Sequence, residues 1–129
     1  MTETHIALAV ASLLAFSPVQ ACGVCNEDKV AATYDHAVVR RATLQGRVVV
    51  FCEVRGTFDS RQLKAAASRI TGIDAVSLRT STNPATVSFA LDSRRQSAQT
   101  AVNALQATAP RGTELVIVQV QGSATARSQ

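Results

Sequence analysis

A run of hydrophobic residues from Val48 to Val54, closed by Gly56, is the strongest strand pattern in the chain. β-branched and aromatic residues dominate it, and such residues are enriched in strands. Because side chains alternate across a strand, every second residue lies on the same face. One face is apolar throughout, with Val50 and Cys52 at its centre, and the other is mixed. The pattern predicts a central strand that packs one face on the core and covers the other only in part.

Two amphipathic helices are predicted after this strand. The first begins at Asp59, which can cap it, has Gln62 at the capping-box position and ends at Gly72. Its apolar residues recur at helical spacing, which is typical of a helix that lies on a sheet. A second helix, from about Ser93 to Ala109, repeats this spacing and is stopped by Pro110.

Three further strands are expected, at Ala75–Thr80, Ala85–Leu91 and Glu114–Gln121. Val76 and Leu78 are expected on one apolar face of the first of them. The order of elements is then β-α-β-β-α-β. This is the ferredoxin-like, split βαβ arrangement, in which an antiparallel four-stranded sheet carries both helices on one face. The sequence therefore predicts an α+β fold.

The segment of residues 22–45, ahead of the central strand, predicts one extra N-terminal helix. Val30, Tyr34 and Val38 fall at helical spacing and form an apolar stripe. Such a stripe needs a surface to cover, and the mixed face of the predicted sheet offers one. Either the helix packs on that face in the same chain, or the open face forms a homodimer. The sequence leaves both arrangements open.

Residues 1–21 resemble a secretory signal peptide. The segment Ile6–Phe16 is an apolar run with the length of a signal-peptide core, and it is too short to span a bilayer comfortably. Small residues suited to cleavage precede Cys22. The first five residues contain no Lys or Arg, whereas a signal peptide usually begins with a positively charged region. The sequence thus predicts a secreted or periplasmic protein. The alternatives are a membrane-attached lipoprotein acylated at Cys22 and a buried N-terminal helix. The small and polar residues 122–129 predict a disordered tail.

Composition and charge narrow the range of functions. Of the 129 residues, 47% are hydrophobic and 17% are charged, which is typical of a globular domain. The formal net charge is +4, but the arginines are scattered and aromatic residues make up only 4%, so no nucleic-acid partner is expected. No Ser/His/Asp set, phosphate-binding loop or pair of catalytic carboxylates can be assembled. We therefore expect no enzymatic activity.

Residues 46–121 resemble the heavy-metal-associated domain, the fold of copper chaperones and of the N-terminal modules of metal-transporting ATPases. The likeness includes the strand that ends at Gly56 and the strand Ala85–Asp92. It also includes the segment Ile70–Val76, ITGIDAV, which is similar to the family's helix-to-strand turn. Its extent is about that of one such domain. The resemblance implies a βαββαβ fold and a role in metal handling.

The metal loop of that family, Gly-Met-x-Cys-x-x-Cys, is not preserved. Gly56 matches its glycine and Thr57 stands where Met is usual. Asp59 and Gln62 stand where the two cysteines belong. A carboxylate and an amide are poor ligands for the soft Cu(I) ion. The family's metal-binding residues therefore have no counterpart at this loop, which is expected to be a plain helix start.

A Cys-x-x-Cys pair, Cys22 and Cys25, lies instead ahead of the leading helix. Two thiolates at this spacing can bind one soft metal ion, either as near-linear Cu(I) or as half of a zinc site. The same pair can form a local disulfide in an oxidising compartment, or Cys22 can carry a lipid. The motif alone leaves these alternatives open, and the resemblance to a metal-handling fold adds weight to metal.

Two further residues are candidate ligands. His36 lies eleven residues beyond Cys25, which is about 16 Å along a continuous helix. We therefore expect His36 at the surface or in packing, and not at an ion shared with the cysteine pair. Cys52 occupies an inward position of the central strand and is expected to be a small core residue.

Three functions remain open at this point. The favoured hypothesis is a small, non-enzymatic, extracytoplasmic protein that binds or traffics a metal, with copper as the ion and a metal-handling protein as partner. The second is a thiol–disulfide redox protein that uses the same cysteine pair. The third is a metal-free interaction module on a degenerate heavy-metal-associated fold.

Overall fold

Strand β1 (Val48–Arg55) lies in the interior of the sheet, as its apolar pattern predicts. In the computed structural model, which describes residues 25–122, β1 pairs antiparallel with β3 (Ala85–Leu91) and with β4 (Glu114–Gln121). Strand β3 pairs in turn, also antiparallel, with β2 (Ile73–Thr82), so the order across the sheet is β2-β3-β1-β4. The predicted bounds of β3 and β4 are confirmed.

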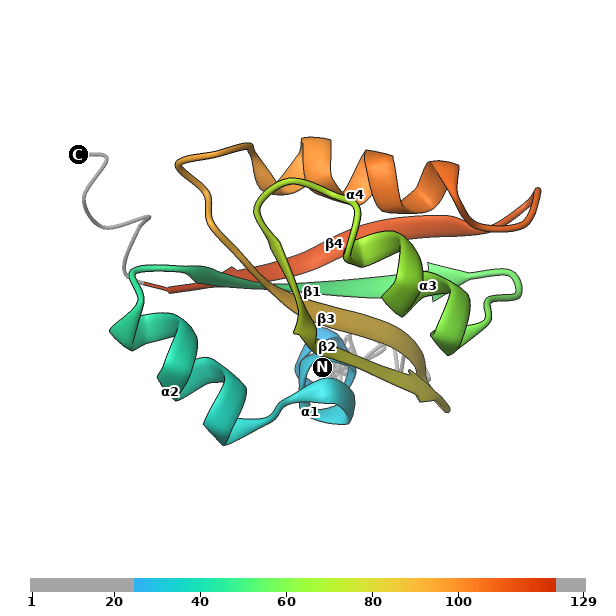
Figure 1. Cartoon of the computed structure of the whole chain (residues 1–129). Helices are drawn as coiled ribbons and strands as arrows, with labels where there is room; N and C mark the ends of the chain where they lie inside the picture. Colours follow the sequence, from blue (N-terminus) through green and yellow to red (C-terminus); the bar gives the residue numbers. More distant parts are fainter. Residues whose placement is uncertain (1–24, 123–129) are drawn as a thin grey trace, which may run out of the picture.

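Helices α3 (Ser60–Ala67) and α4 (Ala98–Ala107) lie together on one face of this sheet (Figure 1). Along the chain the elements follow one another as β1-α3-β2-β3-α4-β4. The predicted α+β class is confirmed. This chain order, combined with the strand order, fits the split βαβ arrangement.

The main core lies between the sheet and these two helices. Phe89 of β3 and Leu105 of α4 are fully buried there, as are Val50 and Val87 of the two central strands. Burying a side chain of this size stabilises a fold by about 1.5–3 kcal/mol. The apolar faces of β1 and β3 against α3 and α4 therefore supply most of the stabilising burial in the domain.

The two helix starts on this face differ in how well the sequence predicts them. Asp59 caps α3 as predicted, because its carboxylate accepts from the backbone amide of Arg61 at 2.8 Å. The capping-box prediction is not realised: Gln62 instead donates from Nε2 to the carbonyl of Thr108, at 3.2 Å, and so ties α3 to the end of α4. Helix α4 begins at Ala98, after its cap Ser97, which is five residues later than predicted.

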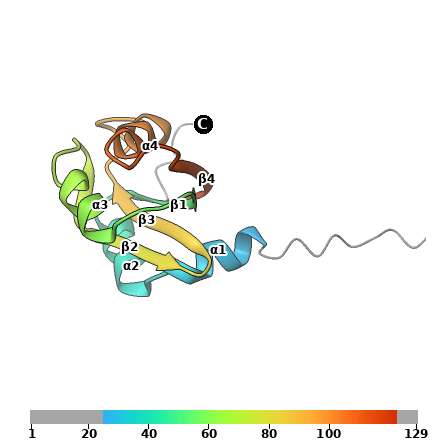
Figure 2. The same ribbon diagram turned by 90° about the vertical axis from the view of Figure 1, so that its right-hand side faces the viewer.

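The opposite face of the sheet carries two helices, α1 (Asn26–Thr33) and α2 (His36–Leu44) (Figures 1 and 2). The prediction of one continuous helix is therefore wrong. Tyr34 and Asp35 adopt extended backbone angles between the two helices. Asp35 then caps α2, accepting from the amide of Ala37 at 2.9 Å. An aspartate can start a new helix in this way because its carboxylate accepts from first-turn amides that have no helical acceptor.

A second, smaller cluster holds these helices on the sheet. Val38 and Ala42 of α2 pack with Val49 and Phe51 of β1 and with Ala90 of β3. All five side chains are at most 8% exposed. The leading segment thus packs on this sheet face in its own chain, which is one of the two arrangements that the sequence left open.

Strand β2 is longer than predicted and contains a bulge. Its register against β3 shifts between Asp74 and Arg79. Inside the bulge the Ser77 hydroxyl takes the place of a ladder partner, accepting from the amide of Ala90 at 2.7 Å. The prediction that Val76 shares a core face with Leu78 is wrong, because Val76 is 64% exposed whereas Leu78 is buried. The carboxylate of Asp74 accepts from the amide of Val76. This bond and the one to the Ser77 hydroxyl take backbone amides that would otherwise join the strand ladder.

Candidate metal-binding segment at the start of α1

Cys25 occupies the N-cap position of α1 and is an exposed, free thiol. Its carbonyl accepts from the amide of Lys29 at 3.1 Å and so starts the helix, while its side chain makes no capping bond. Cys22, the other predicted ligand, lies outside the described residues, as do the predicted signal peptide and residues 123–129 of the predicted tail. Of the predicted pair, the structure therefore places one member, at the solvent-facing end of a helix.

An ion pair fixes this end of α1 to the sheet. Lys29 Nζ lies 3.3 Å from a carboxylate oxygen of Glu53 on β1, and the two side chains are only 16% and 26% exposed. The other carboxylate oxygen of Glu53 lies 3.7 Å from Arg55. Glu53 thus has two cationic partners. The mixed face of β1, which the sequence identified, is used to position the helix that follows Cys25.

Part of the remaining contact between α1 and the sheet is also polar, although Val30 of α1 packs against the apolar cluster under α2. Ser88 of β3 donates its hydroxyl to the carbonyl of Thr33, at 3.3 Å. The hydroxyl oxygens of Thr33 and Thr86 are buried and have no hydrogen-bond partner within the described part of the chain. A buried hydroxyl without a partner costs about 1–3 kcal/mol. These polar contacts therefore position α1 and add little to the stability of the fold.

Asp35 fixes the junction between α1 and α2. Besides capping α2, its carboxylate accepts from Arg79 Nε of β2 at 3.0 Å. This hydrogen bond, together with the backbone bond from Val38, lowers the pKa of Asp35 from its usual 3.8. The end of α1 that lies opposite Cys25 is thereby tied to the edge of the sheet.

The structure separates Cys25 from the other two candidate ligands. Cys52 is 1% exposed and packs in the main core, on the sheet face opposite to α1. Burial raises the pKa of its thiol to about 12, so the thiol stays protonated near neutral pH and is a poor ligand. His36 is exposed and begins α2, beyond the Tyr34–Asp35 break. The predictions of a core cysteine and a surface histidine are confirmed.

The loop that corresponds to the family's metal loop is a helix start, as expected. Asp59 is occupied as the cap of α3 and Gln62 is bonded to Thr108. Gly56 has a φ of +90°, and a Cβ at this position would lie 2.6 Å from the carbonyl oxygen of Gly112. The glycine therefore has a structural cause, a close approach of two turns, which is independent of any metal.

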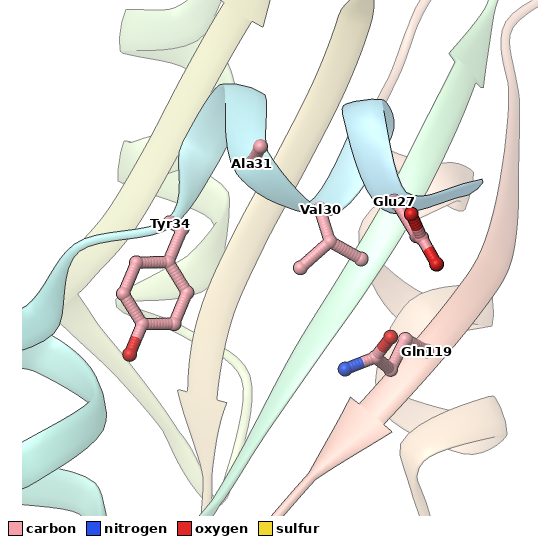
Figure 3. Close-up of a pocket in the computed structure, with 5 residues that line it drawn as sticks. All are labelled: Glu27, Val30, Ala31, Tyr34 and Gln119. Carbon is pink, nitrogen blue, oxygen red and sulfur yellow. The ribbon is translucent and has the colours of Figure 1, made fainter. Parts of the chain in front are cut away.

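A shallow apolar groove lies beside α1, at the β4 side of the sheet. It is lined by Glu27, Val30, Ala31 and Tyr34 of α1 and by Gln119 of β4 (Figure 3). Its volume is about 360 Å³. Tyr34 is 44% exposed, so the apolar stripe that the sequence identified is only partly covered. Gln119 could not be placed next to α1 from the sequence alone, because that requires the strand order.

A second hollow, at the opposite edge of the sheet, is charged but internally compensated. Arg47 lies 3.5 Å from Asp74, and both line the hollow together with Asp92 and Arg95. Arg94 donates to Asp92 at 3.0 Å and thereby lowers the pKa of that carboxyl group. Across residues 25–122, no group of three or more His, Cys, Asp and Glu side chains is gathered so that it could hold a metal ion.

Comparisons of the chain with protein-family models, with curated proteins and with solved structures found no match. The resemblance to heavy-metal-associated domains therefore stays a prediction from the sequence. Among the described residues, no helix has the length and apolar character needed to cross a membrane.

Proposed function

We propose that this protein is a small, non-enzymatic metal-binding or metal-trafficking protein that holds Cu(I) between Cys22 and Cys25. The observation that carries the proposal is the position of Cys25, an exposed free thiol at the first turn of a helix that is fixed to the sheet. A second thiol three residues earlier completes the ligand spacing of a Cys-x-x-Cys pair.

The chemistry of the pair favours a soft, transferable ion. Two thiolates satisfy Cu(I) in near-linear coordination, whereas Zn²⁺ in a structural site takes four ligands. Neither Cys52 nor His36 is placed to supply the missing ligands, since one is in the core and the other lies beyond the helix break. An ion held at the exposed thiol of Cys25 is accessible to a partner's thiols, which suits exchange with a metal-handling protein.

The proposed location is outside the cytoplasm, in the periplasm or the surrounding medium. It is supported by the apolar segment Ile6–Phe16 and by the small residues that precede Cys22. A mature chain that begins at Cys22 would carry the pair at its N-terminus. Mass spectrometry of the protein recovered from its native host tests this, because it reports both the cleavage site and any lipid on Cys22.

Titration of the fully reduced protein with Cu(I), without oxygen and against a chromogenic Cu(I) chelator, tests the metal site. We expect one ion per chain, and we expect Cys25→Ser to abolish stoichiometric binding. Cys52→Ala is the matched control, because it removes a thiol that the fold buries, and it should bind like the unaltered protein. Failure of the reduced protein to retain Cu(I) would overturn the proposal, and a reversible Cys22–Cys25 disulfide in its place would favour the redox function.

A further inference from the structure

The two edges of the sheet differ in how open they are to strand pairing. Strand β2, at one edge, is interrupted by its bulge and carries Asp74 and Arg79. Bulges and charges on an edge strand are devices that prevent pairing with another chain. Strand β4, at the other edge, has no charged residue from Leu115 to Gln121. Within residues 25–122, β4 pairs with β1 alone.

The side chains of β4 are less covered than those of the inner strands. Val116, Ile117, Val118 and Val120 are only partly buried, whereas the residues of β3 from Thr86 to Leu91 are all buried. The apolar groove beside α1 opens next to β4, at Gln119 (Figure 3). An uncharged edge strand with half-covered apolar side chains and a neighbouring apolar groove is a template for one more strand.

We propose that β4 pairs antiparallel with β4 of a second copy of this chain, which joins the two sheets into one. The groove beside α1 then receives a side chain from the second copy. This places the interface at the sheet edge, because the sheet face considered for a homodimer is covered by α1 and α2.

The register of this pairing follows from the faces of β4. Leu115, Ile117 and Val120 face the main core. Val116 and Gln119 pair with Glu53 and Phe51 on the α1 side, and the register shift inserts Val118 next to Gln119 on that same side. A two-fold axis between Val118 and Gln119 keeps core-facing residues opposite core-facing residues along the strand. In this register Val118 of each copy lies opposite Gln119 of the other, beside the groove.

Charge opposes the association and limits its strength. Each chain carries a formal net charge of +4, and Glu27, which lines the groove, lies close to the same edge. Like charges near a two-fold axis repel, and salt screens that repulsion. Together with the small area of one strand pair, this predicts a weak dimer that is half formed at roughly 100 µM and is strengthened by salt.

Sedimentation velocity over a range of protein concentrations, in the presence of a metal chelator and a reductant, tests the proposal. We expect Gln119→Glu to weaken dimerisation at least about tenfold, because it adds one more negative charge beside Val118 of the second copy. Val76→Glu is the matched control: it adds the same charge at an exposed position of the other edge strand and should leave the dimer unchanged. Cys25→Ser should also dimerise normally, which separates this interface from the proposed metal site.

Hydrogen exchange supplies a local readout of the same interface. Backbone amides of residues 115–121 should exchange more slowly as the protein concentration rises, and those of β2 should not change. A protein that stays monomeric up to about 1 mM, tenfold above the expected midpoint, would overturn the proposal. So would a dimer that Gln119→Glu does not weaken.

Discussion

The two faces of the sheet are covered by helices of different character. On the α3–α4 face, fully buried apolar side chains fill one continuous core. On the α1–α2 face, a small apolar cluster lies under α2. Helix α1 adds Val30 to this cluster and otherwise rests on an ion pair, threonines and a serine. Apolar burial gives a large stabilisation, whereas partly exposed polar contacts mainly fix geometry. The α3–α4 face therefore supplies most of the stability of the domain, and the α1–α2 face positions the helix that follows Cys25.

The largest effect is expected from the α3–α4 face. Phe89→Ala should lower the free energy of unfolding by about 4 kcal/mol, because it empties a fully buried site at the centre of β3. Chemical denaturation followed by circular dichroism measures this loss. Val76→Ala, at an exposed position of β2, should change stability little. A loss below about 2 kcal/mol for Phe89→Ala would contradict the importance given to this core.

A smaller effect is expected from the apolar part of the other face. Val38→Ala removes two carbon atoms from the contact of α2 with Val49 and Phe51, which at about 0.8 kcal/mol per buried carbon should cost about 1.5 kcal/mol. The same denaturation experiment applies. Val39→Ala is the control, because Val39 is only partly buried in the same helix and should cost less. Equal losses for the two variants would mean that α2 packs in a different orientation.

How well the sequence predicts this molecule depends on which residues decide each element. The strands β3 and β4 were predictable to the residue because their apolar runs are bounded by Pro84, Asp92 and Gly112. The exposed position of Val76 was not predictable, because it depends on a hydroxyl of Ser77 that bonds to a neighbouring strand. Local patterns thus determine the strands, and long-range polar contacts determine the irregularities.

The candidate site was predictable in part for the same reason. The Cys-x-x-Cys spacing and the inward position of Cys52 can be read from the sequence alone. The break at Asp35 interrupts an apolar stripe that continues at helical spacing, so periodicity alone suggests one helix. The aspartate itself, followed by helix-forming residues, was the available signal for a second helix start. The groove beside α1 required the strand order and could not be inferred.

The junction between α1 and α2 should give a pH-dependent effect. The pKa of Asp35 is lowered in the folded protein, chiefly by its hydrogen bond to Arg79, so its charged form stabilises the fold. That contribution is fully present above 3.8, the usual pKa, and is lost as the pH falls through the lower folded value. Asp35→Asn retains a capping side chain but not the charge. We expect its melting temperature to lie below that of the unaltered protein at neutral pH, with the difference closing in acid.

A thermodynamic cycle with Arg79→Gln isolates the ion pair within that effect. If Asp35 acts through Arg79, the two single variants lose the same interaction. The sum of their losses in free energy of unfolding should then exceed the loss of the double variant. Strict additivity would show that the pH dependence has another origin.

The smallest effect on stability is expected at the contact between α1 and β1. Loss of this contact should loosen α1 locally and should barely change the stability of the whole domain. Lys29→Ala removes the ion pair with Glu53, but Glu53 keeps Arg55 as a partner, so the loss should be at most about 1 kcal/mol. Hydrogen exchange should nevertheless accelerate in residues 26–33 and stay unchanged in α2, because α2 keeps its apolar contacts and its cap. Equal acceleration in both helices would show that they unfold as one unit, and the distinction between a stabilising α2 and a positioned α1 would then be wrong. If exchange changes in α1 alone, the ion pair of Lys29 helps to position the helix that follows Cys25, beside the apolar contact of Val30, and contributes little to the stability of the domain.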